Sequence, residues 1–283
     1  MLNTLVSLFT EIRCLSIGIA LSHLFTLRKG VFSFLSEHAC PKAALFCNDL
    51  WRAKLGYLCD ILAKINQLNL SLQGVGQDIF STQDKIKAFI RKIRVWIARV
   101  EQNDISDFES FTEAVKESQD ENTDSKAIPV ICQHLRQLES NFKHYFPSSE
   151  ASDNSKNWIV NPFLSTVSTS GLSNHDAELL IELSCDSGMK LKFHSLDRCD
   201  FWVHVFHDTH YHSLGEKAVK KLVAFHSTYQ SERGFSDFVI IKNKKRNRLS
   251  NDSLKSLLRN ALTKNVQPRF ERIANLIQQQ KSH

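Results

Sequence analysis

The densest group of potential metal ligands lies at residues 204–212, where four histidines and one aspartate share nine positions. They are His204, His207, Asp208, His210 and His212. The first three stand at i, i+3 and i+4, the spacing that brings side chains to one face of a helix, so they could ligate a divalent cation. No second ligand motif accompanies them, and histidines are common in surface turns. The sequence therefore predicts no metal site and no cofactor.

A second distinctive group is a block of five basic residues within seven positions. It contains Lys242, Lys244, Lys245, Arg246 and Arg248. Such density suits contacts with phosphate groups, or recognition by an acidic nuclear-import receptor. A third interpretation is a solvated charged end that follows an apolar helix. No aromatic residue interrupts the block, so stacking on single-stranded bases is not indicated.

The positive charge of the chain is concentrated near its C-terminal end. The 283 residues carry a formal net charge of +6, but residues 232–283 alone hold 12 Lys or Arg and 4 Asp or Glu, which gives +8. The remaining residues therefore sum to −2, so any attraction to polyanions is expected at the C-terminal end.

Seven cysteines, at positions 14, 40, 47, 59, 132, 185 and 199, form a scattered set without a Cys-x-x-Cys pair. This pattern is typical of reduced thiols and excludes a zinc finger of ordinary spacing. Cys59 falls in an apolar helical pattern and is expected in the core. The longest early uncharged stretch, residues 14–27, is shorter than the roughly 20 residues of a membrane span, and no signal peptide is recognised. We expect an intracellular protein, nuclear or otherwise cytoplasmic, without membrane contact.

The elements that carry these groups should be helices, because only 9 Gly and 5 Pro supply few of the turns that an all-β fold needs. Apolar residues at helical spacing predict helices over residues 19–35 and 45–72, and Gly74 and Gly76 end the second. Further helices are expected through residues 131–146, ending at Pro147, at residues 176–184 and 197–205, and from Leu214 onwards. An acidic stretch at residues 117–126 and two polar loops separate them.

The clearest helix pattern runs from Gln77 to Val100. Its apolar positions alternate steps of three and four residues: Ile86, Phe89, Ile90, Ile93, Trp96, Ile97 and Val100. The opposite face is strongly basic. A basic amphipathic helix can bind membranes, acidic protein partners or nucleic acid, but a charged outer face on a packed bundle helix is the commoner arrangement and the one we expect.

One motif near the C-terminal end is more specific than these helical patterns. One stretch reads Ser227-Thr-Tyr-Gln-Ser-Glu-Arg-Gly-Phe-Ser236 and is followed by an Ile-Lys pair and the basic Arg-Asn-Arg-Leu block. It resembles the C-terminal signature of hAT-superfamily transposases and their Charlie-like, BED-zinc-finger-associated relatives. Further resemblances follow in the family's order, including residues 68–74, 161–163, 182–188 and 190–193, and Phe201-Trp202. They cover nearly the whole chain.

The resemblance also implies that the ancestral active site is incomplete in this chain. Members of the family carry two Asp residues and one Glu on an RNase H-like fold, and the Glu matches Glu232. Both Asp positions, with the N-terminal sheet, would lie upstream of Met1. Two-metal phosphoryl transfer needs several carboxylates around the cations, so Glu232 is expected to be vestigial and the chain not an enzyme. Cys14 also replaces a Trp that the family usually carries.

The sequence thus predicts a mainly α fold: the helical insertion region and C-terminal helices of an RNase H-like hAT transposase, with the sheet missing. Residues 1–212 would form the insertion-like region and 213–283 the dimerisation-like region. The expected function is noncatalytic protein–protein association, as a homodimer or with related hAT-derived proteins. Dimerisation is assigned to Phe235, Leu254, Leu257, Leu258, Leu262, Phe270 and Ile273. The alternatives are nucleic-acid binding through the basic block, or a residual transposase or nuclease subunit.

Overall fold

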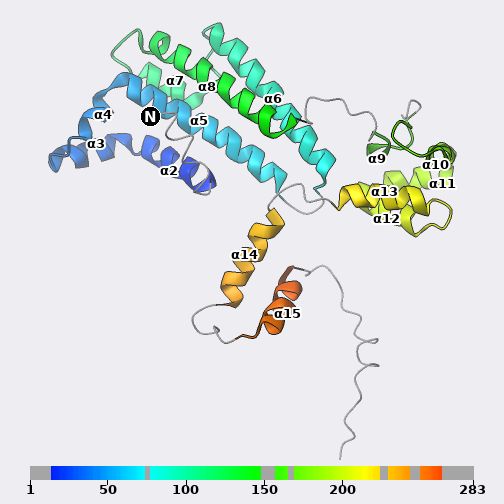
Figure 1. Cartoon of the computed structure of the whole chain (residues 1–283). Coiled ribbons are helices and arrows are strands. Elements are labelled where there is room, and N and C mark those ends of the chain that lie inside the picture. The colour runs from blue at the N-terminus through cyan, green and yellow to red at the C-terminus, as the bar shows by residue number, and fades with distance from the viewer. Residues whose placement is uncertain are drawn as a thin grey trace, which may run out of the picture. The chain divides into compact units, whose positions relative to one another are not determined.

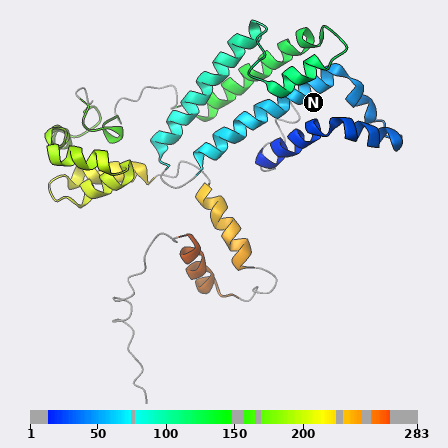
Figure 2. The same ribbon diagram turned by 180° about the vertical axis from the view of Figure 1, so that it is seen from behind.

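The computed structural model describes residues 14–73, 77–147, 157–164, 169–223, 229–242 and 249–262. Helices are the only regular elements in these ranges, so the predicted mainly α fold is confirmed for them (Figure 1). The chain divides into two compact units, Met1–His226 and Ser227–His283. Figure 2 shows the same ribbon from behind.

The first unit begins with α2 (Cys14–Thr26), α3 (Arg28–Glu37) and α4 (Ala43–Cys47), and continues into the long α5 (Asp49–Leu72). The single helix expected over residues 19–35 is thus broken at Leu27, whose ψ angle of 7° departs from helical geometry. The buried guanidinium of Arg28 turns back to donate a 2.8 Å hydrogen bond to the Phe25 carbonyl. This local bond competes with a regular continuation of the helix.

The strongly periodic segment forms α6 (Ile79–Glu101), as expected. Its start is fixed by a capping box, in which the Asp78 carboxylate accepts from the Ser81 amide at 2.7 Å and Ser81 Oγ accepts from the Asp78 amide at 3.1 Å. All seven apolar residues predicted to share one face are buried. The helix therefore packs into a bundle through its apolar face, as expected.

Two further helices complete the first bundle: α7 (Glu109–Lys116) and α8 (Thr123–Tyr145). The close approach of α7 to α5 depends on Gly56, because a Cβ there would lie 2.5 Å from the Ser110 carbonyl oxygen. The Asp60 carboxylate on α5 accepts from the amides of Ser110 and Phe111 at 3.1 and 3.0 Å. These bonds cap the α7 amides, and Cys59 lies in the shared core as expected.

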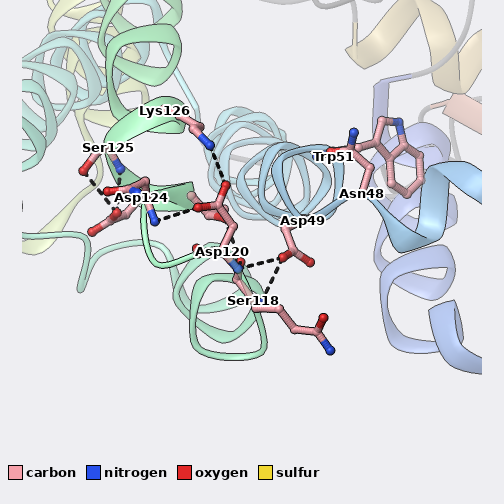
Figure 3. Close-up of polar contacts among 11 residues, drawn as sticks. Asn48, Asp49, Trp51, Ser118, Asp120, Asp124, Ser125 and Lys126 are labelled. Atoms are coloured by element: carbon pink, nitrogen blue, oxygen red, sulfur yellow. Dashed lines mark hydrogen bonds and ion pairs between the residues drawn. The ribbon is translucent and has the colours of Figure 1, made fainter.

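The acidic loop between α7 and α8 is tied to the same helix. The Asp49 carboxylate accepts hydrogen bonds from the amides of Gln119 and Asp120 at 2.9 and 3.1 Å, and Figure 3 shows it directed at the loop that begins at Ser118. Burial opposes ionisation of Asp49, but a hydrogen bond from the Ser118 side chain and these two amide bonds lower its pKa overall. The stretch that composition marks as a polar linker is therefore held against the bundle.

A second cluster of helices packs around its own core within the first unit. It contains α9 (Asn157–Val160), α10 (Asn174–Cys185), α11 (Ser187–Ser195), α12 (Arg198–His207) and α13 (His212–Leu222). Its central ring, Trp202, is fully buried and donates from Nε1 to the Ile159 carbonyl at 2.8 Å. Phe80 at the start of α6 belongs to this core too.

The second unit contains α14 (Tyr229–Ile241) and α15 (Asn251–Leu262), which pack against each other. We call this pair the α14–α15 hairpin. The chain divides between His226 and Ser227, whereas the boundary expected from the sequence follows residue 212, the first residue of α13. The assignment of the two ranges to insertion-like and dimerisation-like regions stays a prediction.

Candidate interaction surfaces

The C-terminal residues singled out by the sequence lie on the α14–α15 hairpin or outside the described residues. Glu232 lies within α14, but the structure does not describe its side chain. The same holds for Leu262 at the end of α15, and Phe270 and Ile273 lie outside the described residues altogether.

The described apolar side chains of the hairpin differ in exposure. Phe235 and Val239, four residues apart on α14, are 71% and 66% exposed, and Leu257 on α15 is 37% exposed. Leu254 is only 8% exposed and Leu258 is half-buried, so these two are largely covered within the chain. The predicted dimerisation residues thus divide into an exposed set and a covered set.

The basic block is described at one residue only. Lys242 is exposed, and its ammonium lies 5.9 Å from the centre of the Phe238 ring. Lys244, Lys245, Arg246 and Arg248 lie outside the described residues. Their roles in phosphate binding or nuclear import stay predictions.

The histidine cluster does not converge on one point. His204 lies 2.6 Å from the Lys192 ammonium, His210 pairs with Glu182 at 2.7 Å, and His212 bonds the Phe206 carbonyl at 2.7 Å. The Asp208 carboxylate accepts from the His210 amide at 2.9 Å, a turn interaction. In the part of the chain that the structure describes, no three His, Cys, Asp or Glu residues form a group that could hold a metal ion.

A groove that the sequence did not single out lies between α5 and α6 of the first unit. It has a volume of about 650 Å³. We call it the basic groove, because its lining includes five cationic residues and no carboxylate: Lys64, Lys85, Arg91, Lys92 and Arg99. Its floor is apolar, with Leu68 from α5 and Ala88 and Val95 from α6.

Two aromatic rings also line the groove but are almost fully buried. Phe89 and Trp96 are 5% and 7% exposed, and the Lys64 ammonium sits 4.8 Å from the Trp96 ring centre. A cation held over an aromatic face at this distance is attracted by the ring quadrupole. Lys64 is thereby fixed at the groove edge without a salt bridge among the described residues.

The cations of the groove differ in how they are neutralised. Arg99 pairs with Asp107 at 2.9 Å, which raises the pKa of its guanidinium, and Lys85 bonds the Ser71 carbonyl and Gln77 across the end of the groove. Arg91 and Lys92 are exposed and have no salt-bridge partner in the described ranges. The groove therefore presents the charges of Arg91 and Lys92 without a salt-bridge partner in the described ranges.

Only part of this surface could be anticipated. The basic face of the α6 segment is visible in the sequence, and one of its arginines, Arg94, is neutralised as a packed bundle helix would suggest, by Glu139 of α8 at 2.6 Å. The contribution of α5 was missed. Lys64, Gln67, Leu68 and Ser71 at i, i+3, i+4 and i+7 are a detectable signal, because that spacing places all four on one face.

These features define a mainly helical protein with a basic groove on one unit and an exposed apolar hairpin on the other. The FAM200/GTF2IRD2-like family model, described as the FAM200/GTF2IRD2 helical domain, matches residues 2–101. The chain is also 26% identical over 250 residues to General transcription factor II-I repeat domain-containing protein 2 of Bos taurus. That alignment covers 88% of this chain, which spans about a quarter (25%) of the length of that relative.

No solved structure matches the chain. Within the described residues, no helix is both long and apolar enough to cross a membrane.

Proposed function

We propose that the chain is a noncatalytic, transposase-derived protein that acts through protein–protein association, and that it self-associates through the α14–α15 hairpin. The observation that carries this proposal is the exposure of Phe235, Val239 and Leu257 on two helices that already pack together. Burying a large apolar side chain contributes about 1.5–3 kcal/mol, so a second copy could gain substantially by covering these side chains.

The transposase ancestry is supported by two independent lines. The hAT-like signature around Glu232 lies in the second unit. The match to the FAM200/GTF2IRD2 helical domain covers residues 2–101, which is part of the region that the resemblance assigns to the helical insertion. An RNase H-like origin of the chain remains part of this proposal.

The noncatalytic assignment follows from the chemistry that phosphoryl transfer needs. A two-metal site requires several carboxylates around cations about 3.5–4 Å apart, and the resemblance supplies one matching position in these residues, Glu232. We expect the purified chain to leave supercoiled plasmid uncut in Mg²⁺ or Mn²⁺. Nicking that disappears in Glu232→Gln would overturn the assignment.

Self-association can be tested by light scattering coupled to size exclusion. The wild-type chain should give about twice the mass of the 32.4 kDa chain, and Phe235→Glu with Leu257→Glu should return it to a monomer by placing charge in an apolar contact. Leu191→Glu is a matched control, because Leu191 is 73% exposed on α11 of the other unit. A wild-type monomer throughout the micromolar range, or a dimer that survives the double substitution, would refute the proposal.

A second candidate function is phosphate contact or nuclear import through the basic block, favoured by five cations in seven residues. Binding to duplex DNA would weaken steeply as salt rises, because each neutralised phosphate releases counterions. Replacing Lys244, Lys245 and Arg246 by Ser should reduce that salt dependence. The same change should shift a fluorescent fusion from the nucleus to the cytoplasm if the block directs import.

A further inference from the structure

The basic groove of the first unit has the features of an incomplete helix bundle. Its α5 side is formed by residues at i, i+3, i+4 and i+7, from Lys64 to Ser71. Its α6 side adds Ala88, Arg91, Lys92, Val95 and Arg99, at i, i+3, i+4, i+7 and i+11. Each helix thus turns one continuous stripe towards the same hollow, the pattern that otherwise packs against a neighbouring helix.

The length of the groove sets the length of a helical segment that could bind in it. Lys85 and Arg99 are the outermost lining residues of α6, 14 positions apart, which corresponds to about 21 Å of helix. Lys85 closes one end by bonding the Ser71 carbonyl across the groove. A segment of about four helical turns would therefore span it.

The apolar and basic residues of the groove indicate the chemistry of its partner. The floor residues Leu68, Ala88 and Val95 are apolar, and Val95 is 47% exposed. The rim carries Lys64, Arg91 and Lys92, which form no salt bridge in the described ranges. We propose that the basic groove binds an acidic amphipathic helix of a partner protein, with its apolar stripe on the floor and carboxylates on its flanks facing the rim.

A nucleic acid fits these observations less well. Single-stranded bases need open aromatic faces, but Phe89 and Trp96 are 5% and 7% exposed and Lys64 covers the Trp96 ring. A phosphate backbone would gain nothing from the exposed side chains of Ala88 and Val95. The apolar floor is useful only to a ligand with apolar groups of its own.

This inference goes beyond the proposed self-association, because it concerns a different unit and a different class of partner. It can therefore be tested in the Phe235→Glu, Leu257→Glu background. Binding lost there together with self-association would place the peptide site on the hairpin and overturn the inference. Binding retained in a monomer would support it.

The probe is a fluorescein-labelled peptide of about 14 residues, with Leu at i, i+3, i+4, i+7 and i+11 and Glu on both flanks. Fluorescence anisotropy should show saturable binding to the full chain. We expect Arg91→Glu with Lys92→Glu to weaken binding by about tenfold or more, since two attractions become repulsions. Val95→Asp should weaken it as well, by charging the floor.

Two controls distinguish specific binding in the groove from attraction by net charge. Lys190→Glu with Lys221→Glu changes the charge of the chain equally at exposed positions on α11 and α13, and binding should be unchanged. A peptide of the same composition with its Leu residues scattered around the helix should bind at least about tenfold more weakly. Circular dichroism of each variant confirms that the helices remain folded.

Three results would overturn the inference. One is the absence of saturable binding by the amphipathic peptide, and another is equal binding of the scrambled peptide, which would show attraction by charge alone. The third is tighter binding of a duplex DNA of similar charge that competes with the peptide and responds to Arg91→Glu but not to Val95→Asp. That outcome would assign the groove to phosphate binding.

Discussion

The Tyr57 hydroxyl and His134 Nδ1 lie 2.7 Å apart, joining α5 to α8 inside the first bundle. Tyr57 is 1% exposed, and burial raises the pKa of its phenol well above the usual value. Burial also lowers the pKa of the His134 imidazole. Both shifts favour the neutral forms, so the pair acts as a neutral hydrogen bond in a largely apolar core.

This pair makes the stability of the first bundle depend on pH. The pKa of His134 is lowered in the folded state, so the unfolded chain binds the proton more readily, and stability present above pH 6.5 should be lost as pH falls. We expect the urea midpoint to drop between pH 7.5 and 5.5. In His134→Gln, which keeps a polar partner for Tyr57 without titrating, the drop should be smaller. An identical drop in both proteins would show that other groups cause it.

The buried carboxylate of Asp176 should be essential to the second helical cluster. It is 1% exposed and accepts from Ser173, Ser213 and Lys217, bonds that lower its pKa to about 2 although burial opposes them. Asp176→Ala leaves Lys217 and both hydroxyls without this acceptor, and we expect a loss of about 3 kcal/mol in denaturant unfolding. Glu178→Ala, on the exposed side of α10, should change stability little. Equal losses would contradict the assigned role.

The indole of Trp202 should contribute by its polar atom as well as by its volume. Its Nε1 donates to the Ile159 carbonyl at 2.8 Å, and both residues are buried. Trp202→Phe removes the donor, leaves a buried carbonyl unsatisfied and opens space, so we expect about 2–4 kcal/mol of destabilisation. Val203→Ala, at a neighbouring position that is 43% exposed, provides the control and should cost less than about 1 kcal/mol.

Two glycines should respond in opposite directions to the same substitution. In Gly56→Ala the new Cβ would meet the Ser110 backbone at 2.5 Å and force α5 and α7 apart, at a cost of about 1–3 kcal/mol. In Gly30→Ala nothing lies within 4 Å of the new Cβ, and the helix propensity of Ala should stabilise α3 by about 0.5–1 kcal/mol. Thermal melts of the two variants therefore should move apart. Parallel shifts would show that the tight α5–α7 approach does not form in solution.

Sequence periodicity predicted the long helices well, because burial against one core imposes the spacing seen in α6. It missed α7, which is only eight residues long and carries just two buried side chains, Phe111 and Ala114, amid acidic neighbours. So short a helix has too few turns to establish a period. Its position depends instead on Gly56 and Asp60, which lie some 50 residues earlier in the chain.

The basic groove could be predicted only in part, for a related reason. The basic face of α6 can be recognised in the sequence. A groove, however, exists only where the α5 residues from Lys64 to Ser71 face it. That pairing is set by packing between two helices. Neither periodicity nor composition contains it.

The Asp78 side chain performs two tasks at once, since it caps α6 through Ser81 and pairs with Arg198 of α12 at 2.6 Å. Phe80, two positions later, lies in the core of the second cluster. The first turn of a helix ordinarily frays, but here fraying would also break contacts that belong to the other cluster. Unfolding of the first bundle should therefore destabilise the second cluster, and the reverse, through the first turn of α6. The two should melt as one cooperative unit.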